Sequence, residues 1–287
     1  MKIEQMIFKS RAWQSLKVHI PAPVRELLAT GLQKIKSLSY ALGCLFRLPG
    51  YTKNWAAIIL KELFLPKGSC IRYHLRNSIS LTIRAKSFDK FIVQEIQTGS
   101  YDIALKELSE SPVVIDAGAH IGVFATKVLS KFPKARLFCI EPIPDNLELL
   151  RKNLSDNAIA GNVTVIESLL SKSEGIKTIY ERKDHSAGFN LYMPTEFKYD
   201  VPSRTLEGVM RDNKITHCDL LKMDIEGGEY EVLMNTPTHV FEKIENIVME
   251  YHPFPKETAD IKRLSEFLSK NGYSLNFYSH KMLYATR

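Results

Sequence analysis

The sequence contains little cysteine, and what it has is scattered. Its four cysteines lie far apart, with no C-x-x-C pair and no histidine cluster at metal-ligand spacing; they are Cys44, Cys70, Cys139 and Cys218. This spacing argues against a cysteine-based metal site. Cys139 stands inside an apolar run and is interpreted as a buried thiol. A reducing compartment fits this pattern best.

Long apolar runs are also missing. Residues 1–9 lack the apolar stretch of a signal peptide. The longest apolar region, around Tyr40 to Phe46, is too short and too interrupted to span a bilayer. We therefore expect the main part of the chain to be soluble and cytoplasmic.

Acidic residues are scarce at one end of the chain only. The formal net charge is +7, yet residues 1–70 hold 11 Lys and Arg against 3 Asp and Glu. The remainder is nearly neutral and lacks the basic face that nucleic-acid binding needs, so no nucleic-acid partner is expected.

Residues 1–66 are predicted to be a basic helical N-terminal extension. Apolar residues recur there at helical spacing with Lys34 and Lys36 between them; they are Leu27, Leu28, Leu32, Ile35, Leu38 and Leu42. We expect this segment to dock on the main domain, to mediate self-association or to touch a membrane surface peripherally.

Residues 67–111 are predicted to form a β-hairpin and a helix. Apolar residues alternate from Ile71 to Leu75 and from Ile79 to Ile83, with the turn residues between them. A helix is expected from Phe88 until Gly99, followed by a second short helix.

Residues 112–287 alternate between apolar strands and helices. Strands are expected at 113–116, 137–141, 163–166, 219–224 and 244–250, which predicts a parallel sheet with helices on both faces. Strands at 273–278 and 282–286 are joined by three residues, so the last strand must enter antiparallel. Residues 183–202 are expected to be a long irregular loop, and such loops are often lids or substrate walls.

The loop after the first of these strands lacks the middle glycine of a dinucleotide site. Gly118 and Gly122 are spaced G-x-x-x-G, and Asp116 closes the strand ahead of them. The glycines leave room for a ligand against the backbone. The missing glycine favours a nucleoside without a pyrophosphate over a nicotinamide-dependent oxidoreductase, which stays open as an alternative.

Acidic residues end the predicted strands. Carboxyl ends of parallel strands meet at one edge of the sheet, which should gather Asp116, Glu141, Glu167, Asp224 and Glu250. Their mutual repulsion predicts a cationic ligand, a metal or donor-rich hydroxyl groups. S-adenosylmethionine (SAM) carries a sulfonium, an ammonium and a ribose, and so fits this site.

Four motifs make the chain resemble the FkbM family of SAM-dependent methyltransferases. They are Glu95 with Tyr101, the loop from Asp116 to Gly122, Val201–Glu207, and the string Leu220-Leu221-Lys222-Met223-Asp224-Ile225-Glu226-Gly227-Gly228-Glu229. Departures from the family pattern are His120, Ala125 and Glu207. The resemblance covers about residues 70–255.

The resemblance implies a Rossmann-like class I methyltransferase fold, an α/β fold with a seven-stranded, mostly parallel sheet. It implies methyl transfer to a hydroxyl, often on a sugar or glycan acceptor. Expected cofactor-binding residues are Glu95, Tyr101, Asp116, Gly118, Ala119, His120, Gly122, Glu141, Pro142, Ser168 and Asp224. Expected catalytic residues are Asp224, Glu250 and His252, the latter two as bases. A non-catalytic protein of the same fold is the remaining alternative.

Two further expectations concern the metal and the acceptor. A magnesium-type divalent cation could bridge Asp224 and Glu226 and lower the pKa of the acceptor hydroxyl. Glu229 is expected to favour the helix dipole rather than to act in catalysis. Acceptor contacts are expected from the 183–202 loop, with these candidates: Asp184, His185, Asn190 and Tyr192.

Overall fold

The computed structural model describes residues 43–181, 189–190, 195–196, 198–252, 260–278 and 281–287. Contacts divide the chain after Leu48, so that residues 49–287 form the larger unit. The expected boundary at residue 66 stays a prediction; Thr52 forms a β-bridge with Leu75, which joins residues near position 52 to the hairpin. The amphipathic helix expected over residues 27–42 lies outside the described residues. None of the described helices is long and apolar enough to cross a membrane.

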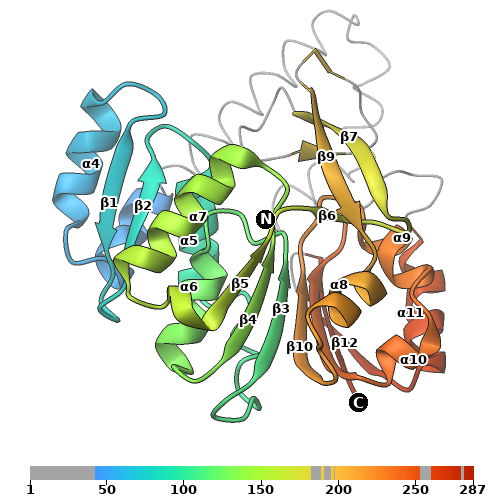
Figure 1. Ribbon diagram of the computed structural model, residues 1–287. Coiled ribbons are helices and arrows are strands. Elements are labelled where there is room, and N and C mark those ends of the chain that lie inside the picture. Colours follow the sequence, from blue (N-terminus) through green and yellow to red (C-terminus); the bar gives the residue numbers. More distant parts are fainter. Residues whose placement is uncertain (1–42, 182–188, 191–194, 197, 253–259, 279–280) are drawn as a thin grey trace, which may run out of the picture. The chain divides into compact units, whose positions relative to one another are not determined.

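A seven-stranded sheet forms the centre of the larger unit (Figure 1). Its strands are β3 (Val113–Ala117), β4 (Arg136–Ile140), β5 (Val163–Ile166), β10 (Cys218–Met223), β11 (Ile244–Glu250), β12 (Ser274–Tyr278) and β13 (Met282–Thr286). Their order is β12-β13-β11-β10-β3-β4-β5, and β13 is antiparallel to both of its neighbours while the other pairs are parallel. The predicted class I methyltransferase fold with an antiparallel last strand is confirmed.

Helices cover both faces of this sheet (Figure 1). On one side lie α5 (Asp89–Gln97), α6 (Val123–Lys131) and α7 (Pro144–Asp156). On the other lie α8 (Leu206–Asp212), α9 (Glu229–Met234), α10 (Thr238–Phe241) and α11 (Ile261–Lys270). Side-chain caps begin two of them, because Thr205 accepts from Gly208 N and Asp260 accepts from Lys262 N and Arg263 N.

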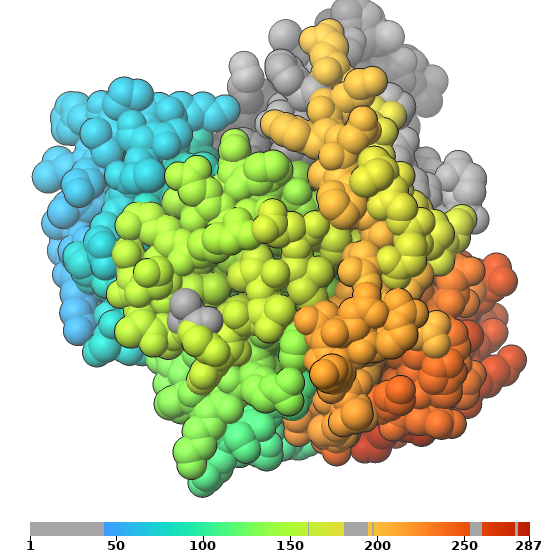
Figure 2. Space-filling model, viewed as in Figure 1, coloured from blue at the N-terminus to red at the C-terminus, as the bar shows by residue number. Residues whose placement is uncertain are grey.

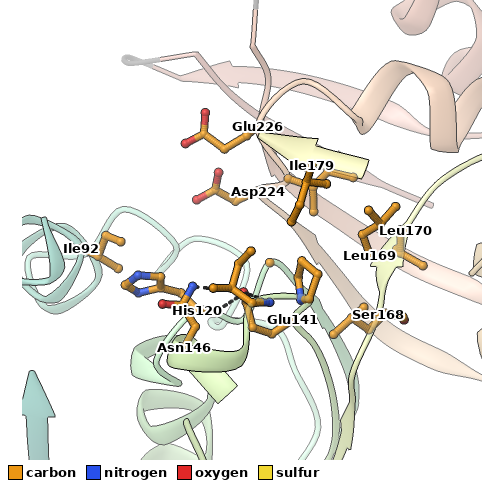
Figure 3. A pocket seen from close by; sticks show the side chains of 15 residues that line it. Ile92, His120, Glu141, Asn146, Ser168, Leu169, Leu170, Ile179, Asp224 and Glu226 are labelled. Carbon is orange, nitrogen blue, oxygen red and sulfur yellow. Dashed lines mark hydrogen bonds between the residues drawn. The ribbon is translucent and has the colours of Figure 1, made fainter. Parts of the chain in front are cut away.

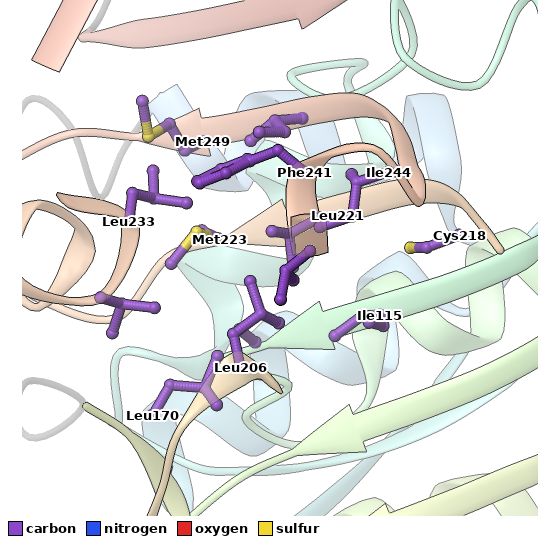
Figure 4. Close-up of a cluster of buried hydrophobic side chains, with 14 of the residues drawn as sticks. Ile115, Leu170, Leu206, Cys218, Leu221, Met223, Leu233, Phe241, Ile244 and Met249 are labelled. Carbon is purple, nitrogen blue, oxygen red and sulfur yellow. The ribbon is translucent and has the colours of Figure 1, made fainter. Parts of the chain in front are cut away.

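The apolar core on the α8–α11 side is continuous. Ile115, Leu221, Met223 and Met249 from the sheet meet Phe241 and other helix side chains there, all nearly inaccessible to water (Figure 4). Burial of such a surface is the main source of folding free energy, at about 25 cal/mol per Å² of apolar area. The core therefore supports the strand ends as a rigid base for the site.

The hairpin is attached to the core by α7. It consists of β1 (Cys70–His74) and β2 (Ser80–Arg84), with α4 (Trp55–Phe64) packed on β1. Asn153 of α7 and its C-cap residue Asn157 each exchange two hydrogen bonds with main-chain groups of β2, over 2.7–3.1 Å. The predicted hairpin and the predicted helix after it are both confirmed. The second short helix is wrong, because residues 99–105 form turns whose hydrogen bonds are mainly of the i to i+3 kind.

A second sheet of four strands was not predicted. It contains β6 (Leu169–Leu170), β7 (Gly175–Glu181), β8 (Phe189–Asn190) and β9 (Lys198–Arg204), in the order β6-β9-β7-β8. A short 3-10 helix, η1 (Ala160–Asn162), precedes β5. The irregular loop expected over 183–202 thus gives way to β9 from residue 198. Only Val201 and Ser203 of β9 are buried, so the apolar signal for a strand is weak.

Candidate active site

A pocket opens at the carboxyl ends of the central strands (Figure 3). Its empty volume is about 810 Å³, part of it continuous with solvent, which is the size range of small-molecule sites. Its apolar lining comes from Ile92, Ile140, Pro142, Ile143, Leu169, Leu170, Ile179 and Ile225. Its other lining residues are Gly118, His120, Glu141, Asn146, Ser168, Asp224 and Glu226.

Glycine is required at position 118 by a close backbone contact. Gly118 has φ +77°, and a Cβ there would lie 1.9 Å from the carbonyl oxygen of Asp224. The amides of Gly118 and Ala119 donate to the carbonyl oxygen of Ile140 over 3.0 and 3.1 Å. Gly122 serves packing instead, because its Cβ would lie 2.6 Å from Leu150 Cδ1. Gly118 alone of these three lines the pocket.

Asp116 is paired inside the protein rather than exposed to a ligand. The parallel register sets Lys222 of β10 beside Asp116 of β3, and Lys222 Nζ lies 3.0 Å from Asp116 Oδ1. Lys222 also donates to the carbonyl oxygen of Gly118 over 2.8 Å. Burial raises the pKa of Asp116, while Lys222 opposes that shift. The side chain of Asp116, one of the expected cofactor-binding residues, is fully buried and outside the pocket lining.

Glu141 presents a fully supported carboxylate to the pocket. Its Oε2 accepts from the amide of His120 over 2.9 Å. Its Oε1 accepts from the amide of Ile143 and from Asn146 Nδ2, both over 3.0 Å (Figure 3). Three donors hold the carboxylate in one orientation, and a carboxylate so held can still accept hydrogen bonds from vicinal hydroxyl groups of a ligand.

A partly buried arginine extends this support to the hairpin. Arg84 of β2 donates to both carboxylate oxygens of Asp89, over 2.9 and 2.8 Å, and to Asn146 Oδ1 over 2.8 Å. Asn146 in turn donates to Glu141, so the hairpin and α5 determine the orientation of a pocket carboxylate. His120 Nε2 lies 3.3 Å from Arg84 Nη2.

Two polar atoms in the pocket have no hydrogen-bond partner among the described residues. They are His120 Nδ1 and Ser168 Oγ, both buried. Burial lowers the pKa of His120 to about 4, so the imidazole is neutral at physiological pH. Unsatisfied buried polar atoms are costly, and a polar ligand in the pocket would satisfy them.

A second acidic group lies beside the pocket on β10 and β11. One ligand atom each of Asp224, Glu250 and His252 lies within 4.8 Å of the others. Burial and the nearby Asp224 raise the pKa of Glu250 to about 7, and the same two causes raise the pKa of Glu95. The hydroxyl of Tyr101, which is fully buried, donates to Asp224 Oδ2 over 3.5 Å.

Glu229 holds the turn that carries Glu226 and also orients His252. It is fully buried and accepts from the amides of Ile225 and Gly227, over 3.0 and 3.1 Å. It lies 3.0 Å from His252 Nδ1, and although burial opposes it, this carboxylate helps to raise the pKa of His252 to about 9. Glu229 thus does more than favour the helix dipole, and it favours the charged form of His252.

The predicted metal pair differs from the group that the structure brings together. Among the described residues, the candidate cluster at this edge is Asp224, Glu250 and His252, without Glu226. Glu226 lies in the pocket lining, and its Oε2 is 3.8 Å from His252 Nε2. A divalent cation bound by this cluster would therefore contact Glu250 of β11 and the neighbouring His252, and not only the turn that carries Asp224 and Glu226.

Residues 116–275 match the family described as the methyltransferase FkbM domain. The chain belongs to the FkbM methyltransferase family. It is 31% identical over 193 residues to the methyltransferase SdnD of Sordaria araneosa, covering 56% of this chain and 74% of that protein. It is 26% identical over 172 residues to the 2-O-methyltransferase NoeI of Sinorhizobium fredii, covering 54% and 70%.

A solved structure is also similar. The crystal structure of an FkbM methyltransferase from Methylobacillus flagellatus KT matches with a TM-score of 0.47 and 18% identity, over 65% of this chain and 46% of that one. Family membership identifies this chain as a SAM-dependent methyltransferase and excludes the oxidoreductase alternative.

The predicted site residues of this FkbM methyltransferase fall into two sets. Those in the pocket lining are Gly118, His120, Glu141, Pro142, Ser168 and Asp224. Those expected at the cofactor but outside the lining are Glu95, Tyr101, Asp116, Ala119 and Gly122. Glu250 and His252 lie next to Asp224. Glu167 is exposed and pairs with Arg151, so it does not join the acidic edge. Asp184, His185 and Tyr192 lie outside the described residues, as does the side chain of Asn190.

Sequence reasoning missed the residues that support the pocket carboxylates. Lys222, Arg84 and Asn146 carry these contacts. A lysine in the middle of an apolar strand was a usable signal for the first, since a buried ammonium needs an acidic partner. The other two depend on how the hairpin packs against α7, which their sequence spacing does not reveal.

Proposed function

We propose that this methyltransferase acts on oxygen, transferring a methyl group to a hydroxyl of a carbohydrate, a glycan or a glycosylated metabolite. The observation that carries the proposal is the position of Glu250. Its side chain lies beside Asp224 and His252 at the edge of the pocket, and its pKa is raised to about 7. A carboxylate with that pKa can accept the proton that a hydroxyl loses on methylation at neutral pH.

The pocket fits SAM on features of this chain alone. Glu141 offers a supported carboxylate for ribose hydroxyls, Gly118 leaves bare backbone, and His120 Nδ1 and Ser168 Oγ offer unsatisfied polar atoms. When bound, SAM supplies an electrophilic methyl carbon. Negative charge on Asp224 and Glu226 in the pocket lining complements a cationic donor.

The protein's own task is to align the acceptor and to take its proton. Glu250 is half deprotonated near pH 7 and can remove the hydroxyl proton. His252 is protonated there because of Glu229 and Glu226, and its charge favours the deprotonated form of Glu250. The hydroxyl of Tyr101 donates to Asp224 Oδ2.

The proposed acceptor class rests on the resemblance described above and on a relative that is named a 2-O-methyltransferase. Acceptor contacts from the 183–202 segment stay a prediction. A divalent cation on Asp224, Glu250 and His252 is a second way to lower the pKa of the hydroxyl, and the three side chains have the oxygen and nitrogen ligands that it needs.

The test is an acceptor series on one sugar scaffold, offering a hydroxyl, an amine or a carboxylate, with product position read by mass spectrometry. We expect methylation at the hydroxyl only, with release of S-adenosylhomocysteine. Methylation confined to the amine or the carboxylate would refute the proposal. Repeating the reaction with EDTA and with added Mg²⁺ distinguishes the metal-assisted route from proton removal by Glu250.

A further inference from the structure

Helix α4 exposes an apolar surface that the core does not use. Its sequence is apolar almost all round, yet Ile58 is its one fully buried side chain. Large side chains project outward instead: Trp55 is 41% exposed, Leu60 56%, Leu63 63% and Phe64 80%. An all-apolar helix is normally buried, so this exposed face calls for a partner.

The part of the chain around α4 is strongly basic. Residues 49–90 contain eight basic residues, which are Lys53, Lys61, Lys67, Arg72, Arg76, Arg84, Lys86 and Lys90. Its two acidic residues both lie in ion pairs, Glu62 with Lys90 over 3.0 Å and Asp89 with Arg84 over 2.8 Å. Lys61 lies on α4 itself, and the amide of Lys86 and the ammonium of Lys90 both bind Glu62 of that helix, so these basic residues form a basic border to α4.

We propose that the α4 face docks on the surface of a bilayer that contains anionic lipids. The surface joins exposed Trp, Leu and Phe side chains to lysines, which is the composition of helices that lie in a membrane interface. A second copy of the chain would bring the same basic border against this one. Residues 1–42, with seven basic and two acidic residues, would also bring like charge. An anionic apolar interface satisfies both features.

The docked helix would be rigidly connected to the catalytic core. Figures 1 and 2 show α4 in blue on the outer side of the hairpin, away from the seven-stranded sheet. Through β1 and β2 it connects to α7, and Arg84 of β2 contacts Asn146 at the pocket. The bilayer would thus orient the pocket as well as recruit the enzyme.

The experiment measures sedimentation of the full chain with vesicles of phosphatidylcholine, with and without phosphatidylglycerol. We expect the wild type to bind the anionic vesicles. A triple variant, Leu60→Glu, Leu63→Glu and Phe64→Glu, should bind them at least ~10-fold more weakly. The matched control is Phe277→Glu, which places one charge on β12 at a side chain of similar exposure, 53%.

A fluorescence measurement reports on α4 directly. The chain has two tryptophans, so Trp13→Phe leaves Trp55 of α4 as the one reporter. Its emission should shift to shorter wavelength on anionic vesicles and stay unchanged on neutral ones. Circular dichroism and SAM binding by calorimetry should be unchanged in the triple variant, which shows that it folds.

Four outcomes would overturn the proposal. The first is equal vesicle binding by the triple variant and the wild type, and the second is a loss of vesicle binding in Phe277→Glu as large as that in the triple variant. The third is vesicle binding that depends on residues 1–42 alone. The fourth is a wild type that does not bind vesicles and dimerises through α4. The last is read by analytical ultracentrifugation, where the triple variant would become monomeric.

Discussion

Acidic residues lie at two halves of one sheet edge, and the groups around them differ between the halves. On β3 and β4, Asp116 is paired with Lys222 and Glu141 accepts three hydrogen bonds. Just after β10 and on β11, Asp224 and Glu250 lie near each other with His252 beside them, and the pKa of Glu250 rises to about 7. Identical residue types therefore serve different ends according to what surrounds them.

This difference in surroundings separates carboxylates suited to ligand recognition from carboxylates suited to proton transfer. A carboxylate that is held by an ion pair or by several hydrogen bonds keeps one orientation, which suits recognition of a ligand. A carboxylate crowded by another carboxylate exchanges protons near neutral pH, which suits general base catalysis. The residues at β3 and β4, which we call the donor half of the site, can thus be tested apart from Glu250 and its neighbours at β10 and β11, which we call the acceptor half.

Removing the crowded carboxylate should have the largest effect. We expect Glu250→Gln to lower kcat by ~10²–10⁴-fold and to leave the affinity for SAM nearly unchanged. In the wild type, kcat/KM should rise with pH through about 7, because the base must be deprotonated. The variant should lose this rise. Steady-state kinetics against pH and calorimetry with SAM check both points. Equal losses in SAM affinity and in kcat would contradict separate roles for the two halves.

Breaking the buried ion pair should cost stability rather than chemistry. Lys222→Met leaves Asp116 charged and uncompensated in the interior, and we expect the free energy of unfolding to fall by about 3–5 kcal/mol. The double variant Asp116→Leu with Lys222→Met should recover most of this loss. Urea unfolding of the wild type and of both variants measures it. If Lys222→Met were as stable as the wild type, Lys222 would not be the group that compensates the charge of Asp116.

His120 should make the stability of the donor half depend on pH. Its pKa of about 4 lies below the ordinary 6.5, so the unfolded chain binds the extra proton first as pH falls. Stability is therefore lost between pH 6.5 and 4, by about 3 kcal/mol in total. We expect His120→Asn to remove this part of the pH dependence. Thermal unfolding of both proteins across that range checks it, and parallel curves would contradict it.

The smallest expected effect comes from the hairpin. Arg84→Lys keeps the charge beside Asp89 but loses the forked geometry that also reaches Asn146, so Glu141 loses part of its support. We expect the Kd for SAM to rise by roughly 10-fold, about 1.4 kcal/mol. The control is Arg151→Lys, an exposed arginine of α7 paired with Glu167. Calorimetry should distinguish the two, and equal affinities would remove the hairpin from the site.

The sequence was a good guide where one residue sets one local conformation. Strand periods, the turn glycine at 118 and the three-residue link before β13 predicted the parallel sheet and its antiparallel last strand. The strand at 163–166 and the one at 244–250 have the predicted bounds. These features depend on neighbours along the chain, so they are readable from it.

What was missed depends on contacts between distant segments. The pairing of Asp116 with Lys222 follows from parallel register across 106 positions, and Arg84 reaches Asn146 across 62. Whether a carboxylate faces a ligand or a lysine is decided by such contacts. The second sheet was missed for another reason, since β9 buries too few apolar side chains to show a strand pattern.

The contact between Gly118 and the Asp224 carbonyl also limits how this enzyme can diversify. No methyl group fits between those two backbones, and the positive φ disfavours every larger residue. Ile92 and Ile179, on the pocket wall, contribute side chains whose size can change without moving a main chain. New substrate specificity can therefore arise by substitution of the wall residues. The spacing between the donor half and the acceptor half is fixed by the contact at Gly118.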